Sequence, residues 1–371
     1  MKVLFVANTD WYLYNFRRSF AQFLTRQGFR VVTVSPSGAY AASLQQLGYR
    51  WIRWEVGRKT ISPFGEIIAL NRLRRIYRQE KPDFVHHFTI KPVLYGSWAA
   101  RSCRIPRIIN AITVRGYVFL ADDLRARALR PLTIAFYRLT LSNRACRVIF
   151  ENEDDQQYFL EARLVSADQS RVIAGVGVDV NRFSPAPQPD GVPLIVFPAR
   201  ILWDKGVGVL VQAARLLRPR LQARFILVGR PDPGNPTTVD EVTLQGWVRE
   251  GLVEYWGWQD DMNTVYQQSH IVTLPSMYEG VPTALLEAAA CGRPLVATNI
   301  SGCRAIVKNG VNGFLVPLND PVALATALET LILDKELRQL MGEAGRKLVV
   351  DQFTDTYTNE RTYAVYRTLM D

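Results

Sequence analysis

The chain has 371 residues, 48% of them hydrophobic, and a formal net charge of +11. This length exceeds what one core usually supports, so two domains are expected, and the apolar content excludes a largely disordered chain. The four cysteines form no CxxC pair, and the adjacent His86 and His87 would point to opposite faces of a strand, so we expect structural thiols and no metal site.

Short β-rich runs alternate with helical patterns in the first half. Strands are expected at 3–7, 31–34, 51–54, 84–86, 107–111 and 147–150, and helices at 16–27, 64–79, 92–102 and 129–142. This alternation is typical of a parallel sheet covered on both faces. The first run is too short for the apolar part of a signal peptide, and no run approaches the ~18 apolar residues of a membrane span. We therefore expect a cytoplasmic protein.

The alternation restarts after residues 175–193, where Gly, Pro and Asp accumulate and indicate a linker. Strands are expected at 194–198, 224–228, 253–255, 271–274 and 294–297, and helices at 208–217, 282–291 and 321–333. The predicted fold class is α/β, with two doubly wound Rossmann-like domains facing each other across a cleft. We expect the domains at 1–175 and 176–353, with a C-terminal helix near 354–371 that packs back on the first.

Nearly all the basic excess lies in the first half. Residues 1–180 hold 27 Lys and Arg against 14 Asp and Glu, whereas the remainder holds 18 against 20. Its basic clusters, such as residues 72–78 and Arg125, Arg127 and Arg130, alternate with apolar side chains. This mixture favours an anionic membrane surface or a lipid-linked phosphate over nucleic acid, since no groove-reading motif accompanies it. A solvated helix face is the alternative.

Two carboxylates, Glu279 and Glu287, lie eight positions apart in the segment YEGVPTALLE. A continuous helix would rise about 12 Å over that interval, so they cannot share a proton on one helix face. Gly280 and Pro282 indicate that a helix begins between them, which places Glu279 in a loop and Glu287 in the helix. Loops between parallel strands and helix N-termini bind anions, so we expect a phosphate there. Stabilisation of the helix N-terminus by Glu279 and a solvated Glu287 are the alternatives.

Four segments carry a family resemblance: ARILWDKG at 199–206, LVGRPD at 227–232, LPSMYEGVPTALLEAAACGRPLVAT at 274–298 and NGFLVP at 312–317. They resemble family 4 of the retaining glycosyltransferases, which have the GT-B fold, and the resemblance extends over essentially the whole chain. The segments FTIKPVLYG at 88–96 and GVGVDVNRFSP at 175–185 are most similar to bacterial members that build surface polysaccharide or lipid-linked oligosaccharide.

The resemblance implies transfer of a hexose or N-acetylhexosamine from a nucleotide-sugar, expected to be a UDP-sugar, to a lipid-linked or oligosaccharide acceptor. It implies that Arg200 and Lys205 receive the charge of the leaving diphosphate and that Glu279 lies near the donor sugar. The sequence contains no Asp-x-Asp, so we expect neither a metal nor another cofactor. Glu287 would bind the ribose hydroxyls. The remaining donor-binding residues would be Gly229, Arg230, Gly280, Val281, Pro282 and Thr283.

Trp256 and Trp258 follow a strand and would line the pocket for the nucleotide base. Packing in the core is the alternative. For Gly229 the alternative is a turn glycine, and for Arg230 a surface position. The acceptor side is less marked, because the chain has Arg115-Gly116 where many family members carry His-Gly. By position the acceptor-side residues would be Asp10, Asn15, Arg17, Lys91 and Arg115, with helix capping or surface salt bridges as alternatives.

The expected enzyme would be peripherally associated with the inner face of the membrane, through its basic first domain. One rival is a nucleotide-sugar 2-epimerase, which the scarcity of histidine disfavours. Another is a catalytically silent basic subunit of a transferase complex, against which the four residues Arg200, Lys205, Glu279 and Glu287 argue.

Overall fold

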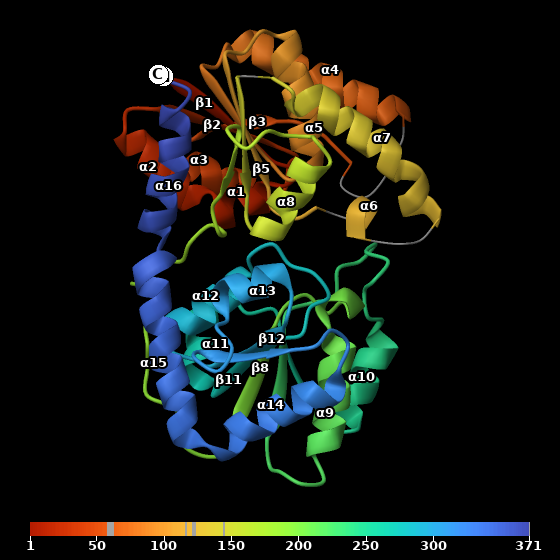
Figure 1. Ribbon diagram of the computed structural model, residues 1–371, viewed down its shortest axis with the longest axis vertical. Helices are drawn as coiled ribbons and strands as arrows, with labels where there is room; N and C mark the ends of the chain where they lie inside the picture. Colours follow the sequence, from red (N-terminus) through yellow and green to blue (C-terminus); the bar gives the residue numbers. More distant parts are fainter. Residues whose placement is uncertain (58–62, 116, 121–123, 144, 371) are drawn as a thin grey trace. The chain divides into compact units, whose positions relative to one another are not determined.

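A computed structural model describes residues 1–57, 63–115, 117–120, 124–143 and 145–370. The chain forms two compact units (Figure 1). Unit 1 comprises Met1–Val176 and Thr358–Asp371, and unit 2 comprises Gly177–Tyr357. Each unit is built around its own parallel sheet.

The sheet of unit 1 has the strand order β3-β2-β1-β4-β5-β6-β7, and all of its pairings are parallel. Its strands are β1 Lys2–Val6, β2 Arg30–Ser35, β3 Arg50–Arg53, β4 Phe84–Phe88, β5 Arg107–Ile112, β6 Cys146–Phe150 and β7 Ser170–Val172. The order reverses between β1 and β4, which is the switch point where open parallel sheets bind ligands.

Helices cover both faces of this sheet, which is why its strands are nearly continuous apolar runs. The helices of unit 1 are α1 Asp10–Phe16, α2 Arg18–Arg26, α3 Ala41–Gln46, α4 Pro63–Glu80, α5 Ile90–Ser102, α6 Tyr117–Leu120, α7 Leu124–Leu141 and α8 Glu153–Glu161. Residues of α4, α5 and α7 pack with Leu4 and Val6 on one face, and residues of α1, α2 and α3 pack with Val3 and Phe5 on the other (Figure 1).

The last helix, α16 (Asp355–Arg367), completes the second of these cores. Tyr366 is fully buried, packs against Phe20 and Phe84, and its hydroxyl lies 3.0 Å from Nδ1 of His86. Asn359 also donates to Oγ of Ser19 at 2.9 Å. Unit 1 is therefore made from both ends of the chain.

The sheet of unit 2 has the order β10-β9-β8-β11-β12-β13, again with parallel pairings, and its switch point lies between β8 and β11. Its strands are β8 Leu194–Pro198, β9 Arg224–Val228, β10 Glu254–Gly257, β11 Ile271–Leu274, β12 Leu295–Thr298 and β13 Gly313–Val316. Its helices are α9 Val207–Leu217, α10 Glu241–Arg249, α11 Met262–Gln268, α12 Thr283–Ala290, α13 Ser301–Ile306, α14 Pro321–Leu333 and α15 Lys335–Gln352, with a 3₁₀ turn, η1, at Trp203–Lys205.

The predicted doubly wound α/β class is confirmed, and several element boundaries are corrected. The helix expected at 16–27 is α2, which begins at Arg18, and a separate helix that was not predicted, α1, precedes it, because Arg17 leaves the helical conformation at φ −122° and ψ 0°. The helix expected from residue 129 begins at Leu124. Within the expected linker at 175–193, Val178 forms a β-bridge with Thr354, so the segment is partly ordered by pairing.

Candidate active site

The candidate residues Arg200, Lys205 and Glu279 lie on loops that follow β8 and β11, the two strands at the switch point of unit 2. β8 leads through Arg200 into η1, which ends at Lys205. β11 leads through the loop 275–282 into α12, with Pro282 as the N-cap in an extended conformation. Glu279 therefore lies in the loop and Glu287 in the helix, as the Gly and Pro residues between them predict.

Lys205 and Glu279 join the two loops. Nζ of Lys205 lies 2.6 Å from Oε1 of Glu279, and both side chains are mostly buried, with exposed fractions of 16% and 13%. The hydroxyl of Ser276 donates to the same carboxylate oxygen at 2.7 Å. The ion pair thus fixes a cation and a carboxylate side by side at the switch point.

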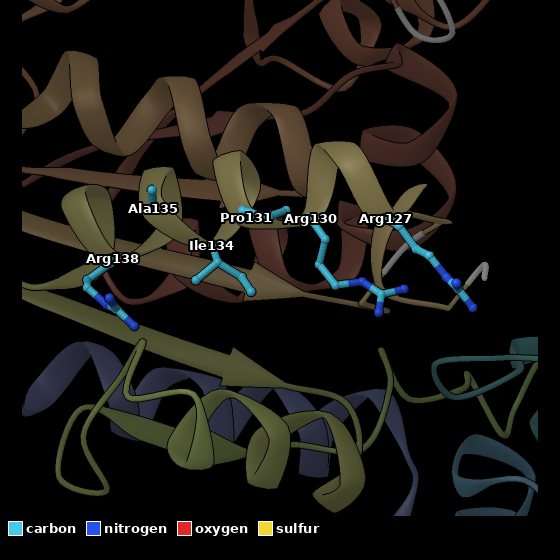
Figure 2. Close-up of a pocket in the computed structure, with 6 residues that line it drawn as sticks. All are labelled: Arg127, Arg130, Pro131, Ile134, Ala135 and Arg138. Atoms are coloured by element: carbon cyan, nitrogen blue, oxygen red, sulfur yellow. The ribbon is translucent and has the colours of Figure 1, made fainter. Parts of the chain in front are cut away.

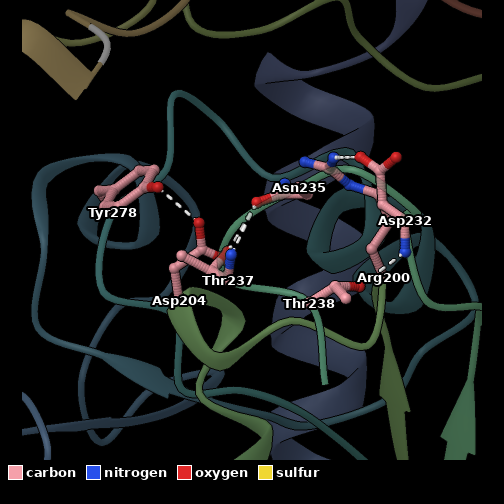
Figure 3. A network of polar contacts seen from close by, with 7 residues as sticks. All are labelled: Arg200, Asp204, Asp232, Asn235, Thr237, Thr238 and Tyr278. Carbon is pink, nitrogen blue, oxygen red and sulfur yellow. Dashed lines mark hydrogen bonds and ion pairs between the residues drawn. The ribbon is translucent and has the colours of Figure 1, made fainter. Parts of the chain in front are cut away.

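Asp204 and Tyr278 form a second connection next to this pair (Figure 3). The Tyr278 hydroxyl donates to Oδ2 of Asp204 at 2.5 Å, and the backbone N–H of Met277 donates to the Asp204 carbonyl at 2.9 Å. Burial and the Asp204 carboxylate raise the pKa of Tyr278, so its hydroxyl stays protonated as a donor. The other carboxylate oxygen of Asp204, Oδ1, is buried with no hydrogen-bond partner among the described residues.

Arg200, in the loop after β8, contacts the loop that follows β9. Its guanidinium is 2.6 Å from Oδ2 of Asp232, and its side chain remains 42% exposed. The backbone N–H of Asp232 donates to the hydroxyl of Thr238 at 2.9 Å (Figure 3). The N–H of Trp203 donates to the Thr237 carbonyl at 2.7 Å. Arg200 is therefore held by a loop that is itself tied to η1.

Two glycines allow these loops to approach one another. A Cβ on Gly302, near the start of α13, would lie 1.7 Å from the carbonyl oxygen of Gly280. A Cβ on Gly229, whose φ is +140°, would lie 2.1 Å from the carbonyl oxygen of Ala199. Contacts this short are sterically forbidden for any side chain. Close packing against the Ala199 backbone therefore explains why position 229 is a glycine. Its contact with a nucleotide stays a prediction.

Glu287 lies one turn into α12 and is half-buried. The hydroxyl of the fully buried Tyr266 donates to its Oε2 at 3.0 Å. Burial raises the pKa of Glu287 to about 7, and the Tyr266 hydrogen bond and the positive charge of Arg182 oppose that shift. The solvated position considered from the sequence is therefore wrong for this residue.

The other donor-side candidates surround the start of α12 and the ends of β9 and β10. Gly280, Val281, Pro282 and Thr283 form the turn into α12, where the first backbone N–H groups of a helix point outward. The guanidinium carbon of Arg230 lies 4.9 Å from the centre of the Trp258 ring, which is 42% exposed. Trp256 is half-buried.

The acceptor-side candidates lie in unit 1, on elements that follow β1, β4 and β5. Asp10 is 5% exposed and accepts hydrogen bonds from the backbone of Trp11 and Tyr40, at 2.8 Å each, so it serves the local fold. Arg17 is also buried, 3.8 Å from Glu151. Asn15 is exposed and donates to the Trp11 carbonyl at 3.0 Å.

Two further acceptor-side candidates are paired with carboxylates. Lys91 forms an ion pair with Glu66 and donates to the carbonyl of Gly57 at 2.6 Å. Arg115 lies 2.6 Å from Asp155, and its guanidinium carbon is 5.1 Å from the centre of the Tyr158 ring. Gly116, the second residue of the Arg-Gly pair, lies outside the described residues.

The three histidines all have structural partners. His87 lies 2.7 Å from both the Tyr77 hydroxyl and the Asn110 side-chain oxygen, and burial lowers its pKa to about 4. His270 accepts from the N–H of Leu194 at 3.0 Å. Within the described residues, no three His, Cys, Asp or Glu side chains are grouped as a metal site, and no helix is long and apolar enough to span a membrane.

Sequence reasoning missed the supporting residues Asp204, Asp232, Tyr266 and Tyr278. Asp204 and Tyr278 each precede a predicted site residue, but their contact joins positions 74 apart in the sequence. The shared edge of parallel strands predicts that the two loops are neighbours. The shared edge does not predict which side chains are in contact, because those contacts depend on the conformation of each loop.

Comparisons with known proteins identify the family of the chain. A family model described as "Glycosyl transferase 4-like" matches residues 2–152, and one described as "Glycosyl transferases group 1" matches residues 192–334. The N,N'-diacetylbacillosaminyl-diphospho-undecaprenol α-1,3-N-acetylgalactosaminyltransferase of Campylobacter jejuni is 26% identical, over 91% of each chain. The UDP-Gal:α-D-GlcNAc-diphosphoundecaprenol α-1,3-galactosyltransferase of Escherichia coli is 26% identical, over 81% of each chain.

Solved structures show the same fold. Anabaena Alr3699/HepE in complex with UDP and glucose superposes with a TM-score of 0.81 at 20% identity, over 99% of each chain. The sucrose-phosphate synthase of Thermosynechococcus elongatus superposes with a TM-score of 0.80 at 20% identity, over 100% of this chain and 99% of that one. The solved structures show that the two units together have the GT-B fold. Because the two family models between them match both halves of the chain, the chain belongs to glycosyltransferase family 4.

Proposed function

We propose that this glycosyltransferase moves a hexose or an N-acetylhexosamine from a UDP-sugar to a lipid-linked or oligosaccharide acceptor in bacterial glycan synthesis. In this proposal transfer retains the anomeric configuration and requires no divalent metal. The observation that carries the proposal is the ion pair between Lys205 and Glu279, which joins the two loops at the switch point of unit 2. Switch points of parallel sheets are where nucleotides bind.

The cations of the site suit the chemistry of the leaving group. When the bond between sugar and diphosphate breaks, negative charge develops on the diphosphate, and preplaced cations stabilise that charge without reorganising. Lys205 would supply a point charge and Arg200 a planar fork for the phosphate oxygens. Both are held by carboxylates, Glu279 and Asp232, at 2.6 Å, so their positions are defined before a donor binds.

The carboxylates of the site suit the two ends of a sugar nucleotide. Glu279 is held by Lys205 and Ser276 through one oxygen, Oε1, which leaves its other oxygen available to a hydroxyl of the donor sugar. Glu287 lies farther along α12, where it would accept hydrogen bonds from the ribose hydroxyls. The start of α12 would lie beside the diphosphate between them, with the backbone N–H groups of its first turn as donors.

The relatives support the choice of donor and acceptor. The Campylobacter jejuni and Escherichia coli enzymes are both named for sugars linked to diphosphoundecaprenol, and the latter for a UDP-Gal donor. Both names specify an α-1,3 linkage. An α product formed from an α-linked sugar nucleotide retains the configuration, which supports the proposed stereochemistry.

Nucleoside diphosphate release tests the proposal. The wild type would be incubated with a panel of UDP- and GDP-sugars, with and without EDTA, and with and without a polyprenyl-diphosphate sugar acceptor. We expect acceptor-stimulated release from one UDP-sugar that EDTA does not reduce, and an α linkage by NMR of the product. Glu287→Ala should abolish release, whereas Glu343→Ala, at an exposed position of α15, should not.

Each part of the proposal has its own contrary result. Release that depends on added Mg²⁺ after EDTA treatment would refute metal independence, and a β product would refute retention. Preference for GDP-sugars would refute the UDP donor. Failure to bind any nucleotide would refute donor binding at Glu287 and favour the non-catalytic subunit.

A further inference from the structure

The two carboxylate oxygens of Glu287 have different surroundings. Oε2 accepts a hydrogen bond from the hydroxyl of Tyr266, a fully buried residue of α11, at 3.0 Å. Oε1 has no hydrogen-bond partner among the described residues. A glutamate side chain on a helix surface is flexible, and binding a ligand costs it that freedom. The contact with Tyr266 restricts the carboxylate beforehand and leaves Oε1 available to a ligand.

The backbone of Tyr266 is itself held by a buried arginine. Arg293 is 1% exposed, and its Nε donates to the carbonyl of Tyr266 at 2.9 Å. Its Nη2 donates to the carbonyls of Gln267 at 3.0 Å and Ala186 at 2.9 Å. The hydroxyl of Ser269 donates to the Tyr266 carbonyl at 2.8 Å. These bonds fix the C-terminal end of α11, so Tyr266 presents its hydroxyl from a rigid support.

The Tyr266 hydroxyl also favours the ionised form of Glu287. Burial raises the pKa of Glu287 to about 7, whereas the hydrogen bond from Tyr266 and the positive charge of Arg182 act to lower it. Burial also raises the pKa of Tyr266 well above its usual range, so its hydroxyl stays a donor at neutral pH. Tyr266 therefore acts on both the orientation and the charge of the carboxylate, whereas Arg182 acts on the charge.

The other titratable and charged groups around α12 keep their charge near neutral pH. Burial raises the pKa of the Cys291 thiol, on the same helix, to about 12. The pKa of Asp261, the N-cap of α11, is lowered by a hydrogen bond from Thr264, so it stays ionised. Arg346 of α15 donates to a carbonyl at the C-terminal end of α12 at 2.8 Å, and arginine stays protonated. Of these groups, Glu287 alone titrates between pH 6 and pH 8.5.

We propose that Tyr266 is a positioning residue, which holds the Glu287 carboxylate in place for the ribose hydroxyls of the donor. This inference rests on the proposed role of Glu287 in binding the ribose. Tyr266 is buried and acts through Glu287, because it engages Oε2 and leaves Oε1 to the ligand. A group that is oriented before binding loses less conformational freedom when the ligand arrives, and the ligand then binds more tightly.

Comparing UDP with 2′-deoxy-UDP isolates the contact with the ribose. The two ligands share their base and diphosphate, so the ratio of their dissociation constants cancels the titration of the phosphate. Calorimetry of the full chain from pH 6 to pH 8.5 measures this ratio, with GDP and 2′-deoxy-GDP if the wild type binds guanine nucleotides instead. We expect the wild type to prefer the ribose form at least about tenfold at pH 8.5, and less at pH 6, where Glu287 is protonated.

Tyr266→Phe keeps the ring in the core and removes the hydroxyl. The variant should lower the preference to about two- to threefold at pH 8.5, because the carboxylate is no longer held. In a Glu287→Gln background, Tyr266→Phe should change the ratio no further. The matched control is Tyr366→Phe in unit 1, which also removes a fully buried hydroxyl, 3.0 Å from Nδ1 of His86. It should keep the wild-type preference.

Arg182→Gln separates positioning from charge. It removes a positive charge that favours the ionised Glu287 but leaves the hydrogen bond from Tyr266 in place. The preference should therefore rise at higher pH than in the wild type and still reach the wild-type value at pH 8.5. The control is Arg127→Gln, which removes an exposed arginine that lines an open groove on α7 of unit 1 (Figure 2). It should match the wild type at every pH.

The possible outcomes distinguish this inference from the proposed function. A wild-type preference at pH 8.5 in Tyr266→Phe would overturn the inference, because the orientation of the carboxylate would not depend on the hydroxyl. Equal losses in Tyr266→Phe and Tyr366→Phe would also overturn it. If Glu287→Gln keeps the wild-type preference, or the wild type binds neither nucleotide, the proposed ribose contact fails and the inference fails with it.

Discussion

Replacing Glu287 by Gln should stabilise the protein at neutral and alkaline pH while impairing its function. Glu287 is half-buried on α12 and is hydrogen-bonded by Tyr266, and its pKa in the folded chain is about 7 against 4.5 for the ordinary group. At pH values between 4.5 and 7, Glu287 is protonated in the folded chain and ionised in the unfolded chain. The stability contributed by this group is therefore complete below pH 4.5 and is lost as the pH rises through 7.

The magnitude follows from that shift. A change of about 2.5 pKa units corresponds to about 3 kcal/mol at a pH above both values. Gln keeps the size of the side chain and an oxygen that accepts from Tyr266, but it carries no charge at any pH. The variant should therefore exceed the wild type in free energy of unfolding by less than about 1 kcal/mol at pH 5 and by about 2–3 kcal/mol at pH 8.

Urea unfolding of both proteins at pH 5, 6, 7 and 8, followed by tryptophan fluorescence, measures this difference. The exposed Glu343→Gln on α15 is the control, because that carboxylate lies at the surface of the folded chain, where the Gln339 side chain donates to it at 3.0 Å. A difference between Glu287→Gln and wild type that stays constant from pH 5 to pH 8 would refute the reasoning. The same variant should raise the donor KM, since an amide replaces the carboxylate that we propose accepts the ribose hydrogen bonds.

Three further predictions concern the loops at the switch point. Lys205→Met should lower kcat by about 10²–10³, because it removes the charge that we propose stabilises the leaving diphosphate; an unchanged rate of nucleoside diphosphate release at saturating donor would contradict this. Gly302→Ala should lower the free energy of unfolding by about 1–3 kcal/mol because its Cβ meets the Gly280 carbonyl, and thermal unfolding that matches the wild type would exclude that contact. Tyr278→Phe should lower the free energy of unfolding by about 1–3 kcal/mol, because Asp204 loses its hydrogen-bond donor. The double variant Tyr278→Phe, Asp204→Asn should lose less than the two single variants lose together. Additive losses would show that the pair is not coupled.

The sequence predicts the fold through features that act over a few residues. Apolar runs of five residues locate most of the strands, and Gly280 and Pro282 locate the start of α12 within one residue. The presence of α1 and its separation from α2 escape such reasoning. The spacing of the apolar residues continues through Arg17, and the break lies in the backbone of a residue whose side chain is buried against Phe88.

The candidate site is predictable in its location but not in its contacts. Parallel strands bring Arg200, Lys205 and Glu279 to one edge of a sheet, and that follows from the order of elements alone. The raised pKa of Glu287 depends on burial, and the residue that donates to its carboxylate, Tyr266, belongs to another element, α11. Burial of this kind is a property of tertiary packing, and no local pattern in YEGVPTALLE reports it.

The contribution of α16 to unit 1 constrains the order in which the chain can fold during synthesis. Strands β1 to β7 leave the ribosome before Tyr366, which fills the core between Phe20 and Phe84. All of unit 2, residues 177–357, is made in between. At about 5–20 residues per second this interval is roughly 10–40 s. During that time the nascent unit 1 has a gap where Tyr366 will pack, whereas unit 2 is one continuous stretch and can fold as soon as it emerges.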